Sequence, residues 1–134
     1  MPRTLRFRVG KLIRDRLPAI MQADGLTTFE RALPLRDFQA ALAAKLVEEA
    51  REAAASGTRA ELVEELADVA EVILALTAAH GIDAAEIEAA RIAKRAARGG
   101  FDGRVWNDAV AAPEGCPALD YYLARRHAYP QEGE

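Results

Sequence analysis

Glu48-Glu49-Ala50-Arg51-Glu52, followed after a break at Ser56-Gly57-Thr58 by Glu65-Leu66-Ala67-Asp68, is the stretch of sequence that decides the fold. Both acidic runs lie in segments with the apolar periodicity of α-helices. A break of three residues is short enough to join two neighbouring helices as an antiparallel hairpin. We therefore expect helices over about 34–54 and 58–80 to lie side by side, with acidic groups between them.

Helix angles place four of these carboxylates on the faces that should meet. The apolar stripes that define those faces are Phe38, Leu42 and Leu46 on the first helix, and Leu62, Leu66, Val69, Ile73 and Leu76 on the second. At about 100° per residue, Glu49 falls inside the first stripe and Glu52 lies beside it. Glu65 falls inside the second stripe and Asp68 lies at its edge, whereas Glu64 and Glu71 point away. Carboxylates on such faces need partners, because burying an unpaired charge is costly.

A metal site accounts for this arrangement. Four carboxylates turned toward one another repel unless cations separate them or some of them stay protonated. A ligand set made only of oxygen atoms suits Mg²⁺, with Mn²⁺ as a substitute. The competing interpretation is a pair of amphipathic helices with surface glutamates, but the helix angles favour the metal site. The sequence contains no Glu-x-x-His, which argues against a ferritin-like di-iron bundle.

Length and charge narrow the class of protein. The chain has 134 residues, half of them apolar, and a net charge of −3. These values fit one domain over 1–112 with a C-terminal tail over 113–134. The mild negative charge argues against a nucleic-acid polymer as partner, and no apolar run is long enough to span a membrane. The single cysteine, Cys116, cannot form an intramolecular disulfide, so we expect a cytoplasmic protein.

The remaining elements complete an all-α helical bundle. We expect a third long helix that is capped by Asp83 and ends at Gly99-Gly100. Shorter helices are predicted over about 15–23 and 118–127. The segment 27–33 should be extended, and 101–107 should be a strand or an irregular arm.

The second long helix predicts an oligomer. Its far side carries another apolar face, made of Val63, Ala67, Ala70 and Leu74. A helix that is apolar on two faces is buried on two faces, and one small bundle could hardly cover both. We therefore expect the bundle to be completed in a homodimer or a higher homo-oligomer.

Two basic clusters lie outside the acidic stretch. One consists of Lys11, Arg14 and Arg16, and the other of Lys94, Arg95 and Arg98. Each cluster is either a solvated basic surface or a set of phosphate contacts. The residues alone leave both interpretations open.

Three motifs resemble one enzyme family. Glu48-Glu49-x-x-Glu52, twelve residues, then Glu65-x-x-Asp68 is similar to the motif of the MazG-like, all-α nucleoside triphosphate pyrophosphohydrolases. Lys11-Leu12-Ile13-Arg14-Asp15 resembles the Lys-Leu-Val-Arg-Asp of the phosphoribosyl-ATP pyrophosphohydrolase-like subgroup. Arg98-Gly99-Gly100-Phe101 resembles the Arg-Gly-Gly-Phe of the same subgroup. The resemblance covers about Lys11 to Val105.

The resemblance implies Mg²⁺-dependent hydrolysis of a nucleotide triphosphate between its α and β phosphates, which yields a monophosphate and pyrophosphate. By position, the implied metal ligands are Glu49, Glu52, Glu65 and Asp68. Glu48 would be an auxiliary acid that orients or deprotonates the attacking water. The leaving pyrophosphate needs positive charge, for which the candidates are Lys11, Arg14, Lys94 and Arg98.

The substrate is open between two possibilities. We expect house-cleaning of non-standard or excess nucleotides, because the Lys11–Asp15 element sets this chain apart from ordinary histidine-pathway enzymes. The alternative is hydrolysis of phosphoribosyl-ATP in histidine biosynthesis. A helical interaction module without catalysis is a further alternative, against which the complete set of acids argues.

Overall fold

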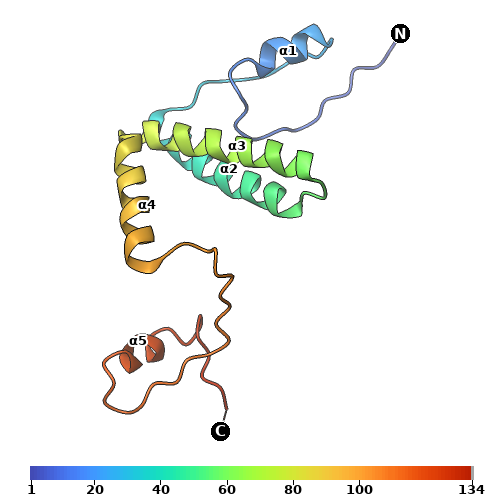
Figure 1. Ribbon diagram of the computed structural model, residues 1–134. Coiled ribbons are helices and arrows are strands. Elements are labelled where there is room, and N and C mark those ends of the chain that lie inside the picture. The colour runs from blue at the N-terminus through green and yellow to red at the C-terminus, as the bar shows by residue number, and fades with distance from the viewer. Residues whose placement is uncertain (134) are drawn as a thin grey trace. The chain divides into compact units, whose positions relative to one another are not determined.

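The computed structural model describes residues 1–133, and within them every regular element is a helix (Figure 1). The helices are α1 (Leu17–Ala23), α2 (Leu35–Ala55), α3 (Arg59–Ala79), α4 (Ala84–Arg98) and α5 (Leu119–Leu123). The all-α class predicted from the sequence is confirmed. The segments 27–33 and 101–107 contain no strand, and 101–107 is an irregular arm that begins with a bend and a turn.

Local signals in the sequence set the ends of the long helices. The Thr58 hydroxyl accepts a hydrogen bond from the Glu61 amide at 3.1 Å, while the Glu61 carboxylate accepts one from the Gly57 amide at 2.9 Å. This reciprocal arrangement satisfies amides that would otherwise lack partners at the start of α3. α3 ends at Ala79, and Gly81 follows two positions later with a φ of +65°, which favours a residue without a side chain.

α4 begins in the same way as α3. The Asp83 carboxylate accepts from the Ala85 amide at 3.0 Å, and the Glu86 carboxylate accepts from the Asp83 amide at 2.9 Å. The helix starts where the sequence predicted a cap. Gly99 follows its last residue with a φ of +83°, so it ends the helix in the manner expected of that glycine pair.

α2 and α3 form an antiparallel hairpin and lie side by side in Figure 1. Leu42 and Val72 are the buried apolar side chains between them. At the open end of the hairpin, the Gln39 amide donates to the carbonyl of Ala79 at 2.8 Å. Because the loop over 56–58 joins the other end, both ends of the hairpin are fixed and the two helix faces are held in register.

The face that α3 turns toward α2 differs from the apolar stripe predicted for it. Leu62, Leu66 and Ile73 of that stripe are 40–51% exposed. The inner face instead follows Glu65, Asp68, Val69 and Val72, which are buried or half-buried. The helix is therefore rotated by roughly 60° from the expected phase. The physical reason is that α3 is apolar on more than one side, so apolar residues alone do not define the face that meets α2.

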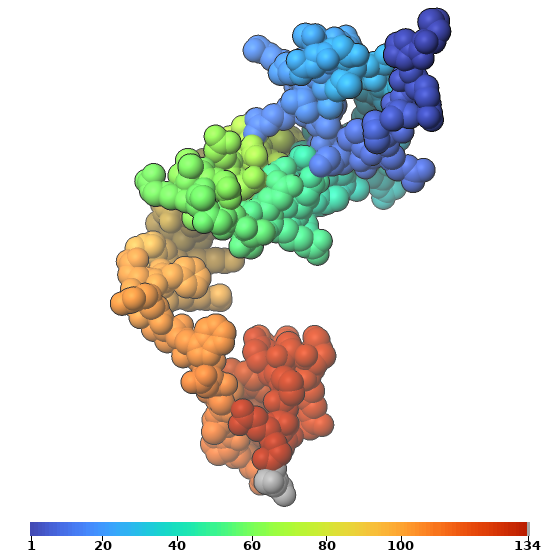
Figure 2. Space-filling model, turned by 90° about the vertical axis from the view of Figure 1, so that its right-hand side faces the viewer, coloured from blue at the N-terminus to red at the C-terminus, as the bar shows by residue number. Residues whose placement is uncertain are grey.

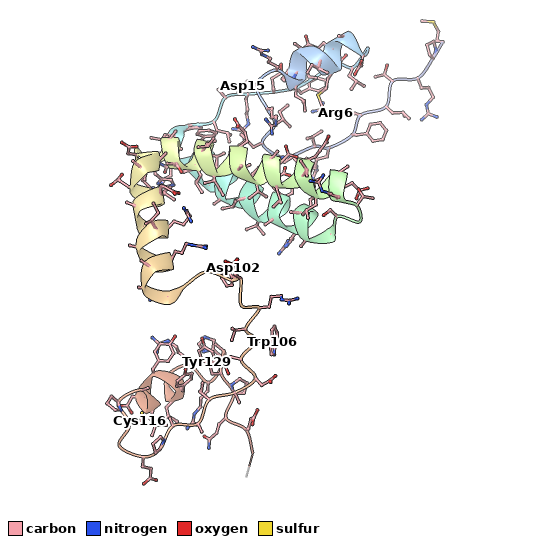
Figure 3. The ribbon with its side chains drawn as sticks, in the orientation of Figure 1. Arg6, Asp15, Asp102, Trp106, Cys116 and Tyr129 are labelled. Carbon is pink, nitrogen blue, oxygen red and sulfur yellow. The ribbon has the colours of Figure 1, made fainter. Side chains whose placement is uncertain are left out.

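Residues 1–97 and the residues from Arg98 onward form two compact units. In the first unit, the segment that contains Lys11 and Arg14 lies against the hairpin (Figure 2). In the second, Tyr122 packs edge to face against both Tyr121 and Tyr129, and the Arg125 guanidinium lies 3.9 Å from the centre of the Tyr121 ring. Trp106 and Tyr129 are labelled in Figure 3. The domain boundary predicted at 112 remains a prediction.

No helix in the part of the chain that the structure describes combines the length and apolarity that crossing a membrane requires.

Candidate active site

The hairpin brings acidic side chains from both helices to one place. Glu49 comes from the C-terminal half of α2, and Glu65 and Asp68 come from the N-terminal half of α3. One carboxylate oxygen of each lies within 4.8 Å of the others. Glu49 is only 6% exposed, although it is charged. Since glutamate is almost never buried without a partner, this position requires a specific explanation.

Two carboxylate oxygens in the cluster lack hydrogen-bond partners. They are Oε2 of Glu49 and Oε2 of Glu65, and both are inaccessible to solvent. Burial raises the pKa of Glu65, with further contributions from a hydrogen bond to Glu52 and from repulsion by Glu52, Asp68 and Glu49. The site therefore disfavours the full set of negative charges in the absence of a cation. Glu52 is itself exposed and stands at the rim of the cluster.

Three cations contact the acids. Lys45 reaches Glu49 at 3.3 Å and Glu48 at 3.8 Å from within α2. Lys11 reaches Glu48 Oε1 at 3.0 Å, and Arg14 reaches Asp68 Oδ1 at 2.7 Å. The last two belong to the irregular segment 10–16, here called the N-terminal arm, which leads into α1. Asp15, labelled in Figure 3, marks the turn between the arm and that helix.

The ion pair between Lys11 of the arm and Glu48 of α2 shifts the pKa of both residues. The hydrogen bond from Lys11 lowers the pKa of Glu48, and the same bond raises the pKa of Lys11. Glu48 is thus held as a carboxylate at neutral pH. Five carboxylates at 48, 49, 52, 65 and 68 face three cations, so two negative charges remain without a counter-ion when all are ionised.

A protein-family model described as phosphoribosyl-ATP pyrophosphohydrolase matches residues 27–95, just over half of the chain. The chain belongs to this family. The phosphoribosyl-ATP pyrophosphohydrolase family is part of the MazG-like all-α pyrophosphohydrolase superfamily, as the sequence motifs predicted. The protein is accordingly a pyrophosphohydrolase, a hydrolase that acts on phosphoric anhydrides. Comparisons with curated proteins and with solved structures each find no match.

The match to the phosphoribosyl-ATP pyrophosphohydrolase family contains the acidic cluster but not the whole candidate site. All five carboxylates and Lys45 lie within residues 27–95, whereas Lys11, Arg14 and Arg98 lie outside this range. The contact of the N-terminal arm with the cluster is thus a feature of this chain's structure that the family match does not describe.

A divalent cation fits the residues that are present in this pyrophosphohydrolase. Three carboxylate oxygens converge, and two buried oxygens lack hydrogen-bond partners that a cation could replace. All the donors are oxygen atoms, which is the set preferred by Mg²⁺ and Mn²⁺. Glu49, Glu65 and Asp68 could hold the ion, with Glu52 able to approach from the rim.

Only two of the four predicted substrate contacts lie against the acidic cluster in the structure. It brings Lys11 and Arg14 to the carboxylates, as described. Lys94 instead lines a shallow apolar groove along α4 with Ile82 and Ile87. Arg98 is the last residue of α4 and the first of the second unit. Phosphate binding by Lys94 and Arg98 therefore remains a prediction from the sequence.

Lys45 is a site residue that the sequence reasoning missed. Its side chain is only 18% exposed, because it points along α2 into the acidic cluster. The signal that could have revealed it is the spacing from Lys45 to Glu49, which places the two side chains on the same face one turn apart.

Proposed function

We propose that this pyrophosphohydrolase uses Mg²⁺ to cleave a nucleotide triphosphate between its α and β phosphates, which yields a nucleoside monophosphate and pyrophosphate. The observation that supports this most strongly is the convergence of Glu49, Glu65 and Asp68 within 4.8 Å, with buried oxygens that lack partners. These residues lie inside the range that matches the family. Family membership also favours an enzyme over a helical interaction module without catalysis.

The roles of the residues follow from their surroundings. Glu49, Glu52, Glu65 and Asp68 would hold the ion through carboxylate oxygens. A Mg²⁺ ion bound there would neutralise phosphate charge and increase the acidity of a coordinated water. Glu48 stays ionised beside Lys11 and Lys45, so its carboxylate can accept a hydrogen bond from the attacking water and orient it. Lys11 and Arg14 would face the departing pyrophosphate, with Lys94 and Arg98 as further candidates.

Phosphoribosyl-ATP is the first substrate to test. The house-cleaning role expected from the sequence is less favoured, because the family description names phosphoribosyl-ATP. House-cleaning of other nucleotides remains the second candidate. The observation in its favour is that the N-terminal arm lies outside the family match and still contacts the acids through Lys11 and Arg14.

A pyrophosphate-release assay with Mg²⁺ tests this proposal. The panel contains phosphoribosyl-ATP, the standard nucleoside triphosphates and oxidised or deaminated forms of them. We expect pyrophosphate and a monophosphate as products, with the highest kcat/KM for phosphoribosyl-ATP. A preference for a modified base would support the house-cleaning role instead. Release of single phosphates, or no turnover of any nucleotide, would contradict α–β cleavage.

We also propose that the enzyme is a homodimer in the cytoplasm. Val63 and Leu74 on the far side of α3 are 54% and 57% exposed, and Ala67 and Ala70 between them are exposed as well. A second copy of the chain is the simplest cover for this face. The lone Cys116, which is a free thiol, fits a reducing compartment.

A further inference from the structure

The N-terminal arm reaches the acids from a distant part of the sequence. Lys11 and Glu48 are 37 positions apart, and Arg14 and Asp68 are 54 positions apart. Leu12 and Ile13 between the two cations are half-buried, so this part of the arm lies on the protein and not in solvent. In Figure 1 the segment descends to the hairpin before it rises into α1. The arm is thus attached to the rim of the cluster by two charged contacts.

One of these contacts involves a carboxylate of the candidate metal site. Asp68 is among the three residues whose oxygens converge, and its Oδ1 accepts the hydrogen bond from Arg14. A guanidinium at 2.7 Å would place positive charge next to a dication bound by the same carboxylate. Both members of the pair are well exposed, at 59% and 40%, and exposed ion pairs are weak. A divalent cation can therefore displace the Arg14 guanidinium from Asp68.

We propose that the N-terminal arm is a counter-ion latch whose release is coupled to metal binding. Without metal, Arg14 and Lys11 neutralise Asp68 and Glu48 and hold the arm against the hairpin. When the carboxylates bind a divalent ion, Arg14 leaves Asp68, and its guanidinium becomes available to the phosphates of the substrate. The second half of this inference rests on the proposed function. Arg14 thus contacts Asp68 when the site is empty and the substrate phosphates when the site is occupied.

Arm movement is measured directly by pulsed EPR. Spin labels are attached at Val9→Cys and Glu71→Cys in a Cys116→Ser background, since Val9 is 54% exposed and Glu71 lies on the exposed side of α3. The doubly labelled chain is diluted into excess unlabelled protein, so that distances between subunits do not contribute. Under these conditions we expect one narrow distance distribution in chelator. Saturating Mg²⁺, established by calorimetry on the same sample, should broaden and shift it. An unchanged distribution at saturation would overturn the latch.

A matched pair of variants separates the latch from a general effect of charge. Arg14→Gln removes the contact with Asp68, whereas Arg16→Gln removes the same charge two positions along the arm. Among the residues that the structure describes, Arg16 forms no ion pair. Arg14→Gln should tighten Mg²⁺ binding roughly fivefold and broaden the distance distribution even in chelator. Arg16→Gln should do neither, and equal effects of both variants would refute the latch.

Further outcomes distinguish this inference from the proposed function. With Mg²⁺ present, Arg14→Gln should weaken the binding of inorganic pyrophosphate, whereas Arg16→Gln should not. Equal affinities of the two variants for pyrophosphate would contradict the transfer of Arg14 to the phosphates. Arm release on Mg²⁺ binding without hydrolysis of any nucleotide would support the latch and contradict the enzymatic proposal. Absence of Mg²⁺ binding would contradict both.

Discussion

The ammonium group of Lys45 lies 3.3 Å from the buried carboxylate of Glu49, one helical turn further along α2. It supplies positive charge to the least exposed acid of the cluster. Lys45→Met should lower the stability of the metal-free protein by about 1–3 kcal/mol, since it leaves a buried charge without its contact. The same change should tighten Mg²⁺ binding, because a competing cation is lost. Chemical denaturation in chelator and calorimetry with Mg²⁺ measure the two effects.

Arg51→Met is the control for this variant, because Arg51 lies on the same helix and is exposed. It should change stability by no more than about 0.5 kcal/mol. If Arg51→Met and Lys45→Met have the same effect on both measurements, the Lys45–Glu49 contact has no special role.

Neighbouring acids on α3 should differ sharply in function. Glu65→Gln and Asp68→Asn keep the shape of the side chain but remove the charge that binds a cation, so we expect them to abolish hydrolysis. Glu64→Gln and Glu71→Gln, which are exposed, should leave kcat within a few-fold of the wild-type value. Mg²⁺ affinity and kcat for all four variants test this. Equal losses at Glu64 and Glu65 would contradict the assignment of ligands.

The first long helix offers the same contrast. Glu49→Gln and Glu52→Gln should abolish turnover through loss of metal binding. Glu48→Gln should slow turnover and leave Mg²⁺ affinity nearly unchanged, because Glu48 pairs with Lys11 and Lys45 and stays outside the convergent set. A loss of Mg²⁺ affinity in Glu48→Gln as large as that in Glu49→Gln would make Glu48 a ligand.

Metal-free stability should depend on pH through Glu65. Its pKa is higher in the folded protein than the ordinary value, so the folded state binds this proton more tightly than the unfolded chain does. The resulting stabilisation is fully present below the unfolded pKa and is lost as the pH rises through the folded pKa. In chelator, Glu65→Gln should therefore be more stable than wild type at neutral pH, and the difference should shrink as the pH falls through that window. Melting temperatures from about pH 4 to 8, a range that begins near the ordinary carboxyl pKa and extends above it, check this.

Metal removal should abolish activity reversibly. Exhaustive chelation should stop pyrophosphate release, and Mg²⁺ or Mn²⁺ should restore it. Ca²⁺ should bind without supporting turnover, since it accepts looser geometry than Mg²⁺ does. Added Mg²⁺ should also raise the melting temperature, because it binds the folded state and relieves the repulsion among the carboxylates. Full activity after chelation would contradict the metal site.

Substitution on the far face of α3 should dissociate the oligomer. Light scattering at micromolar concentration should give the mass of a dimer or a higher assembly for the wild type. Leu74→Glu places a charge on the exposed apolar face and should yield a monomer. Leu26→Glu is the matched control, since Leu26 is 56% exposed and Leu74 is 57% exposed. A wild-type mass equal to one chain would contradict the dimer.

Much of the helical framework was predictable because its signals are local. Thr58 with Glu61, and Asp83 with Glu86, are capping pairs that are readable from the sequence, and the helices start beside them. The inward turn of Glu65 and Asp68 followed from their place near the apolar stripe of α3. The phase of that helix was wrong by roughly 60°, and the observed rotation brings both acids closer to the centre of the inner face.

The contacts of the N-terminal arm could not be predicted from local patterns. Lys11 and Arg14 lie on an irregular segment, where no periodicity relates one side chain to another. Their partners lie 37 and 54 positions further along the chain, so only the folded chain reveals the pairing. Lys45 was missed for the opposite reason. A lysine in an alanine-rich helix looks like an ordinary solvated residue unless its spacing to Glu49 is considered.

The aromatic side chains divide unevenly between the two units. All three tyrosines and the only tryptophan lie at 106 or beyond, and Trp106 is 84% exposed with its indole hydrogen-bonded to Asp108. The unit that carries the carboxylates has neither residue type, whereas it holds nearly all of the helix. Tyrosine and tryptophan absorbance and indole emission will therefore follow only the unit that begins at Arg98, and far-ultraviolet circular dichroism will follow mainly the helices of the other. One thermal scan with both signals can resolve whether the two units melt together or in separate steps.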